Sequence, residues 1–178
     1  MILLRGINVG AANRLSMPDL RGALSEAGYA DVRTYVQSGN IVLGSDASPA
    51  GLASAVSALI RERFGLDVPA IARTHDELER VVADNPFPEA AAESPKRYQV
   101  TFLLSEPDAA AVAAAATLAG AEERFAAHGR ELYGWHPGGI HLSKLANRLT
   151  PKLLGVELAT ARNWTTVTTL LEMSADAH

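Results

Sequence analysis

The stretch DVRTYVQSGNIVLGS, residues 31–45, contains two runs that are rich in β-branched and aromatic residues. The two runs meet at Ser38 and Gly39, and both residue types favour turns. The stretch therefore predicts a β-hairpin with Ser38-Gly39 as a two-residue loop, so that Gln37 pairs with Asn40.

Strand periodicity assigns the side chains of this hairpin to two faces, because successive residues of a strand point in opposite directions. The apolar face is the predicted core face, and it comprises Val32, Thr34, Val36, Ile41 and Leu43. The other face is mixed polar and aromatic, and it comprises Arg33, Tyr35, Gln37, Asn40 and Val42. We expect this second face to contact solvent, a ligand or another part of the protein.

The segments around the hairpin extend it into a ferredoxin-like unit. A strand is predicted before it, followed by a helix that Ser16 caps and Gly28 ends. A second helix ends at Gly65, and a further strand contains Pro69, which cannot donate to a ladder and so favours a sheet edge. The resulting order is β-α-β-β-α-β.

The second half repeats part of this order after a proline-containing boundary. We expect a strand from residue 98, an alanine-rich helix, a hairpin that turns at His128-Gly129, a helical segment that Pro151 interrupts, and a closing helix. The predicted fold class is α+β, with two ferredoxin-like units and antiparallel sheets. The predicted limits are an N-terminal unit over 1–85, a linker over 86–97 and a C-terminal βαββα unit over 98–178.

The composition excludes several classes of protein. The 178 residues include no cysteine, which excludes disulfides, thiolate nucleophiles and cysteine-ligated zinc. The formal net charge of −4 disfavours a strong electrostatic grip on nucleic acid. No apolar run is long enough to cross a membrane, and no secretory signal is recognisable, so a cytoplasmic location without membrane contact is expected. The oligomeric state is not indicated.

The loop RGINVG, residues 5–10, is the first candidate site. Arg5 is suited to hold a phosphate or carboxylate through two parallel hydrogen bonds, and Asn8 adds a polar side chain. Backbone N–H groups near Gly6 and Gly10 are suited to form an anion-binding nest. The GK[ST] ending of a P-loop is absent, and the same residues would suit a simple strand-to-helix turn, so both interpretations stay open.

The tip of the predicted hairpin is the second candidate site. Gln37 and Asn40 offer amide groups there, and Ser38 offers a hydroxyl. A turn alone would also use these residues, and this structural interpretation is the favoured one. Ser38 is not expected to be a nucleophile, because the chain has no GxSxG elbow and no base is placed beside it.

The third candidate site combines Lys144 with Arg162 and Asn163. Asn163 is expected to cap the last helix, whereas the two cations are harder to explain as core residues. If the two halves face each other, Lys144 and Arg162 would be able to receive an anionic group, because clefts between domains are common ligand sites.

The histidines do not form a recognisable metal motif. His136 and His141 are five residues apart, and Pro137-Gly138-Gly139 separates them without an adjacent carboxylate. We therefore expect no metal and no cofactor. A general base remains an alternative role for either histidine.

Three stretches together resemble a bacterial family catalogued as domain of unknown function 1697. They are LLRGINVG (3–10), RTYVQSGNIVL (33–43) and ARNWTTVTTLLEM (161–173). The resemblance implies an α+β fold built from ferredoxin-like units, and it implies no activity.

The chain departs from this family's pattern in two places. Ala11-Ala12 stands where many members have a glycine pair. In GGIHLSKL, His141 and Leu142 replace the Gly-Arg pair of the common GIGRSKL form, so a basic contact offered by relatives is not expected here.

These observations favour an α+β protein that binds a small anionic ligand, bearing phosphate or carboxylate, between its two halves, either as a binding protein or as an enzyme. The predicted ligand residues are Arg5, Asn8, Gln37, Ser38, Asn40, Lys144, Arg162 and Asn163. One alternative is single-stranded nucleic-acid binding through the open sheet face, where Arg33 and Tyr35 suit base stacking. The other is a protein-interaction or structural module.

Overall fold

The structure is a computed structural model, and it describes residues 1–10 and 13–175. The pair Ala11-Ala12, which departs from the family's glycine pair, lies outside the described residues. The chain forms two compact units, one of residues 1–79 with 169–178 and one of residues 80–168. We call them the first and the second unit and describe each by itself.

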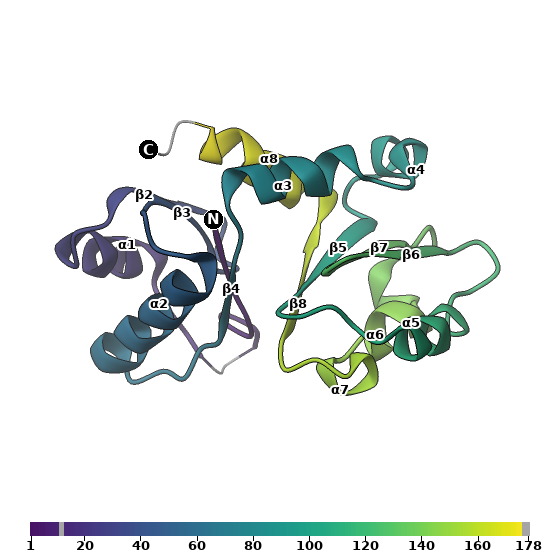
Figure 1. Cartoon of the computed structure of the whole chain (residues 1–178), viewed down its shortest axis with the longest axis horizontal. Helices are drawn as coiled ribbons and strands as arrows, with labels where there is room; N and C mark the ends of the chain where they lie inside the picture. The colour runs from purple at the N-terminus through teal and green to yellow at the C-terminus, as the bar shows by residue number, and fades with distance from the viewer. Residues whose placement is uncertain (11–12, 176–178) are drawn as a thin grey trace. The chain divides into compact units, whose positions relative to one another are not determined.

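The first unit contains the predicted β-α-β-β-α-β order. Its neighbouring strands are all antiparallel and lie in the order β2-β3-β1-β4, which is the ferredoxin-like arrangement (Figure 1). The elements are β1 (Ile2–Leu4), α1 (Met17–Glu26), β2 (Ala30–Tyr35), β3 (Asn40–Gly44), α2 (Pro49–Phe64) and β4 (Ala70–Ala72). The predicted fold class is confirmed for this unit.

The core of the first unit lies between the sheet and the helices α1 and α2, which cover the same sheet face (Figure 1). Leu20 of α1, Val56 of α2 and Ile41 of β3 are all completely buried there. Burial of such side chains stabilises the fold by about 25 cal/mol per Å² of apolar surface. The caps confirm the predicted helix ends, since Ser16 Oγ accepts a hydrogen bond from Asp19 N and Gly65 ends α2 with φ +68°.

The hairpin has a longer loop than the sequence predicts. Tyr35 pairs with Asn40, so four residues, 36–39, form the loop, and the predicted pairing of Gln37 with Asn40 is wrong. The β2 residues next to the loop therefore each pair with the β3 residue two positions before the predicted one. Because side chains alternate with a period of two, a shift of two residues leaves them on their predicted faces. Val36 is the exception, because it lies in the loop with φ +50°. The residue is 53% exposed, whereas the sequence places it on the core face.

Contacts of Gly39 and Asn40 explain the longer loop. Gly39 has φ +74°, and a Cβ atom placed on it would lie only 2.6 Å from Cβ of Leu4. Its carbonyl accepts a hydrogen bond from Leu4 N at 2.8 Å. The buried Asn40 side chain donates to the Tyr35 carbonyl at 3.1 Å and to Ser38 Oγ at 3.0 Å, which closes the loop internally.

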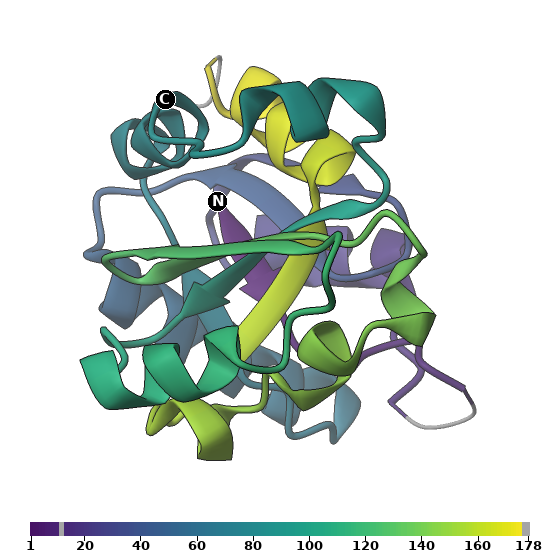
Figure 2. The same cartoon turned by 90° about the vertical axis from the view of Figure 1, so that its right-hand side faces the viewer.

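The second unit repeats the same sheet order, β6-β7-β5-β8, with antiparallel neighbours. Helices α5, α6 and α7 cover one face of this sheet (Figure 2). The elements are β5 (Tyr98–Leu103), α5 (Ala109–Ala116), β6 (Arg124–His128), β7 (Glu131–Trp135), the 3₁₀ turn η1 (Ile140–Leu142), α6 (Lys144–Arg148), α7 (Pro151–Leu154) and β8 (Ala159–Asn163). Both units are therefore ferredoxin-like, as predicted.

The sequence misses strand β8, so the predicted βαββα order of this half is incomplete. Two of the buried residues of β8 are polar, Thr160 and Arg162, and the strand therefore lacks apolar alternation. The hairpin turns at Gly129-Arg130, one residue later than predicted. Pro151 does interrupt the helical segment, because it begins α7.

Three further helices connect and complete the units: α3 (His75–Ala83), α4 (Pro88–Glu93) and α8 (Trp164–Ser174). The segment predicted as a linker, 86–97, thus contains a helix. The boundaries of this division of the chain fall within α3, after Glu79, and within α8, after Thr168. This grouping divides the chain differently from the predicted limits at 85 and 98.

The second sheet face of the second unit is covered by residues from the helices. The Tyr133 hydroxyl donates to the carbonyl of Val81 at 3.0 Å. The rings of Tyr98 and Trp164 meet edge to face with centroids 5.4 Å apart, a favourable aromatic geometry. Trp164 is thus a packing residue at the start of α8. Within the described part of the chain, no helix is long and apolar enough to span a membrane.

Candidate functional site

The Asn8 side chain of the first candidate loop forms hydrogen bonds to two other backbone segments. Its Oδ1 accepts a hydrogen bond from Leu15 N at 2.9 Å, and its Nδ2 donates to the carbonyls of Leu15 at 2.9 Å and Gln37 at 2.8 Å. Asn8 has φ +53°, a left-handed conformation that asparagine tolerates better than most residues. The side chain therefore joins the loop to the hairpin turn, and Arg5 beside it is exposed.

The hairpin tip has an internal bonding pattern of its own. Ser38 Oγ accepts from the Asn40 amide, and Asn40 is completely buried. Gln37 is exposed, and its backbone carbonyl accepts a hydrogen bond from the Asn8 side-chain amide. The structure thus brings Asn8, Gln37, Ser38 and Asn40 together in the first unit, in contacts that stabilise the loop.

The remaining predicted residues lie in the second unit and have different environments. Asn163 Oδ1 accepts from Thr166 N at 2.9 Å, so it caps the first turn of α8 as expected. Arg162 is 9% exposed and donates to Thr160 Oγ1 and to the Ala161 carbonyl, both at 2.8 Å. Burial lowers the pKa of Arg162 to about 10, so the guanidinium remains charged at neutral pH.

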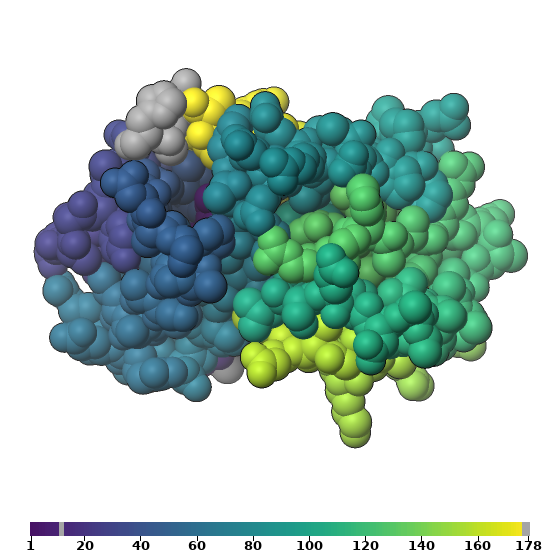
Figure 3. All heavy atoms as spheres, in the orientation of Figure 1, coloured from purple at the N-terminus to yellow at the C-terminus, as the bar shows by residue number. Residues whose placement is uncertain are grey.

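Lys144 lies at a pocket of about 440 Å³ within the second unit. Two segments supply the pocket walls, 118–123 after helix α5 and 137–144 from the turn after β7 to the start of α6. Atoms of this unit, coloured teal to green, are visible at the molecular surface in the space-filling view (Figure 3). The lining residues are Leu118, Gly120, Ala121, Glu122, Glu123, Pro137, Gly138, Gly139, Leu142, Ser143 and Lys144.

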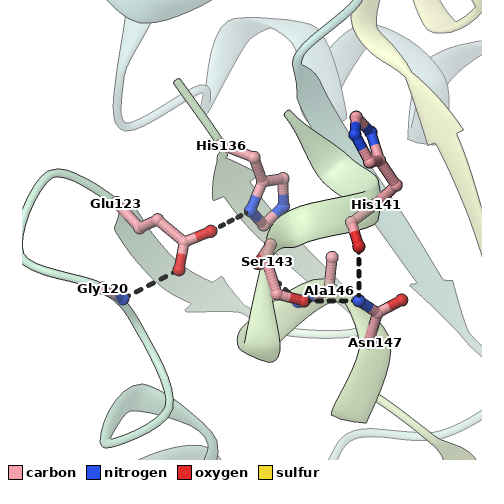
Figure 4. Close-up of polar contacts among 7 residues, drawn as sticks. All are labelled: Gly120, Glu123, His136, His141, Ser143, Ala146 and Asn147. Atoms are coloured by element: carbon pink, nitrogen blue, oxygen red, sulfur yellow. Dashed lines mark hydrogen bonds and ion pairs between the residues drawn. The ribbon is translucent and has the colours of Figure 1, made fainter. Parts of the chain in front are cut away.

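A partly buried carboxylate lies between the two pocket walls. Glu123 Oε1 lies 2.7 Å from Nδ1 of His136, and Oε2 accepts from Gly120 N at 2.8 Å (Figure 4). Ser143 Oγ accepts from Ala146 N at 2.9 Å and so caps the start of α6. Glu123 therefore connects its own loop to the end of β7.

These contacts set the ionisation of Glu123. Burial raises the pKa of this carboxyl, but the hydrogen bonds from Gly120, Ser143 and His136 and the charge of His136 outweigh burial and lower the pKa below 4.5. Glu123 is thus ionised at neutral pH, and His136 Nδ1 is the donor in their hydrogen bond.

Gly134 provides the space that the buried His136 ring occupies. A Cβ atom placed on Gly134 would lie 2.7 Å from His136 Nε2. The two residues are two positions apart on β7 and its extension, and hence point to the same face. His136 is 1% exposed, whereas the His141 ring points away from Glu123 and is exposed (Figure 4).

The sequence misses Glu123 as a site residue. No carboxylate lies next to His136 in the sequence, yet Glu123 contacts it from thirteen residues away. The hairpin of β6 and β7 brings the two residues together, because Arg124 pairs with Trp135. A correct hairpin register would have revealed this pair. Within residues 1–10 and 13–175, no group of three histidine, aspartate or glutamate side chains is arranged to hold a metal ion.

Comparison with known proteins identifies the family and the fold. The family described as "Protein of unknown function (DUF1697)" matches residues 1–133. The chain is similar in structure to the conserved bacterial protein SP0830 from Streptococcus pneumoniae, with a TM-score of 0.71 and 21% sequence identity. The similarity covers 97% of this chain and 96% of that chain. No curated protein matches the sequence.

Proposed function

Because this chain belongs to the DUF1697 family, whose description names no activity, we propose from the geometry that it binds a small anionic ligand in the pocket beside Lys144. The observation that carries this proposal is a cavity of about 440 Å³ with an exposed lysine in its wall. Pockets for small ligands commonly have volumes of about 300–1,000 Å³.

Lys144 is the only cation among the described lining residues. Its side chain has no hydrogen bond or ion pair with any described residue, so its three donors are available to a ligand. The carboxylate of Glu123 lies in the same lining but is already bonded to His136 and Gly120 N. Its hydrogen-bonding capacity is therefore largely used within the protein.

The other predicted ligand residues divide into those with structural contacts and those that are exposed. Asn8, Asn40 and Asn163 use their side chains in internal hydrogen bonds. The placement of a ligand between the two halves stays a prediction, and so do the contributions of Arg5 and Arg162 to it. Lys144 is the residue of the predicted set that lines a described pocket.

One of the two residues of the nucleic-acid alternative has a contact within the protein. The Arg33 guanidinium donates from Nη2 to the Met173 carbonyl at 2.6 Å, and its Nε is buried. These donors are therefore not available to a nucleic acid. The structure offers no observation that specifically favours the interaction-module alternative.

A titration with small anions tests the proposal. Backbone amide NMR signals of the ¹⁵N-labelled protein would be followed during additions of acetate, inorganic phosphate and a pentose phosphate. We expect the signals of Gly138, Gly139 and Lys144 to shift, because these residues line the pocket. Loss of Lys144 should weaken binding about tenfold or more, since a charge-assisted hydrogen bond contributes about 1.5–3 kcal/mol.

Lys152→Ala is the matched control for Lys144→Ala. Lys152 is also an exposed lysine of a short helix, but it does not line the pocket. Equal loss of affinity in the two variants, or pocket signals that no anion shifts, would contradict the proposal.

A further inference from the structure

The pocket beside Lys144 also has apolar walls. Leu118 and Ala121 line it from one segment, and Pro137 and Leu142 line it from the other. We infer that its ligand is a singly charged carboxylic acid with an apolar body, such as an aryl- or alkyl-substituted acid, and this inference rests on the proposed function. A sugar phosphate or a polyphosphate would fit these walls less well, for two reasons.

The first reason is the exposure of Leu142. Its side chain is 71% exposed, although it lies in the 3₁₀ turn that leads into Ser143 and Lys144. Of the large apolar side chains that are exposed in the described part of the chain, Leu142 alone lines this pocket. Covering it with the apolar part of a ligand removes that surface from water, which a sugar hydroxyl does not achieve.

The position of Leu142 links this apolar surface to the cation. Leu142 and Lys144 both line the pocket and are separated only by Ser143. Ser143 is buried, and its hydroxyl accepts from Ala146 N at 2.9 Å, so the segment that bears both side chains is held in place. A ligand with a carboxylate at Lys144 therefore has leucine surface within reach of its adjoining carbon atoms.

The second reason is the charge of the lining. Lys144 contributes one positive charge, whereas Glu122 and Glu123 contribute two negative charges, so carboxylates outnumber cations in the lining. A ligand with several negative charges would be repelled by this lining more strongly than a monoanion. A single carboxylate is able to pair with Lys144 without that added repulsion.

A panel of four probes separates charge from apolar character. The probes are 4-phenylbutyrate, its neutral amide, gluconate as a hydrophilic monoanion, and inorganic phosphate. We expect 4-phenylbutyrate to bind with the lowest dissociation constant in calorimetry or NMR titration. The neutral amide should bind more weakly because it has no charge to pair with Lys144. Gluconate should bind more weakly because it has no apolar surface to contact Leu142.

Substitutions then assign each contribution to a residue. Leu142→Asn should weaken 4-phenylbutyrate binding roughly five- to tenfold while leaving gluconate binding unchanged, because only the apolar contact is lost. Leu104→Asn is the matched control, since Leu104 is also exposed but does not line the pocket. Lys144→Ala should remove the preference for the acid over its amide. Circular dichroism and thermal melts would establish that each variant is folded.

The outcomes distinguish this inference from the proposed function. Binding of gluconate or phosphate that depends on Lys144, with no preference for 4-phenylbutyrate and no effect of Leu142→Asn, overturns the inference and supports the proposed function. Equal binding of the acid and the amide overturns both, as does a panel in which no probe binds.

Discussion

His136 Nδ1 lies 2.7 Å from Glu123 Oε1, and this hydrogen bond joins the end of strand β7 to the loop before strand β6. The His136 side chain is 1% exposed, and that of Glu123 is 12% exposed. Because Glu123 also accepts from Gly120 N, a single carboxylate joins the 118–123 wall of the pocket to the residue that precedes the 137–144 wall. Several measurable consequences arise from this arrangement.

Replacing Glu123 with alanine should destabilise the protein by about 1–3 kcal/mol. The change leaves the buried His136 ring without its acceptor, and an unsatisfied buried polar group costs about that much, whereas the exposed Gly120 N–H is able to bond to water instead. Urea denaturation would measure the loss. Glu122→Ala is the control, because Glu122 is an exposed neighbour and should change stability by less than about 0.5 kcal/mol. Similar losses in the two variants would show that the Glu123 contacts contribute little.

Stability should decline in acid partly through Glu123. The pKa of this carboxyl is lowered in the folded protein, so around pH 4.5 the unfolded chain binds more protons at this position than the folded chain. The contribution of Glu123 is therefore fully present above pH 4.5 and is lost as the pH falls through the lowered folded value. The free energy of unfolding, measured from pH 7 to pH 3, should fall more steeply for the native protein than for Glu123→Gln. Parallel curves would contradict the lowered pKa.

Gly134→Ala should disturb the hydrogen bond between His136 and Glu123 by crowding the His136 ring. The added Cβ would lie 2.7 Å from His136 Nε2, so the ring must move away from its present position beside Glu123. Overpacking of this kind typically costs about 1–3 kcal/mol. Thermal unfolding measures the cost, and histidine NMR signals report the displacement of the ring. Gly138→Ala is the comparison, because no atom lies within 4 Å of the added methyl group there. A Gly134→Ala variant as stable as Gly138→Ala would refute this explanation of Gly134.

Comparing alanine substitutions at Gly39 and Gly6 distinguishes backbone strain from steric crowding. Their φ angles are +74° and +72°, so alanine meets similar strain at both positions, about 1–2 kcal/mol. Only at Gly39 does the new methyl group also collide with Leu4 Cβ, at 2.6 Å. Gly39→Ala should therefore be more destabilising than Gly6→Ala by about 1–3 kcal/mol in urea denaturation. Equal effects would mean that the close approach of Gly39 to Leu4 adds no cost beyond backbone strain.

Patterns within a few residues were sufficient to predict most of the helices. Thr74 and Glu77 have the spacing of a capping box and form one, with Thr74 N donating to the Glu77 carboxylate and Glu77 N donating to Thr74 Oγ1. Asn163 caps α8, and Pro151 begins α7. These signals are reliable because the residues that form each contact are neighbours in the chain.

The candidate site was predicted less completely than the fold. Lys144 was identified from its charge, and it lines a pocket. The residues that shape this pocket were not identified together, because Glu123 reaches His136 only through the pairing of β6 with β7. Neither residue has a neighbour in the sequence that indicates this contact.

The sequence by itself determined the two ferredoxin-like units and the faces of their strands, because apolar periodicity and caps depend on nearby residues. Tertiary structure alone decided the four-residue loop beside Leu4, the strand β8 around the buried Arg162, and the bond between Glu123 and His136. Each of these features depends on an atom that reaches its partner only after distant strands have paired. The physical cause is therefore close packing and hydrogen bonding across the folded chain, which local periodicity does not encode.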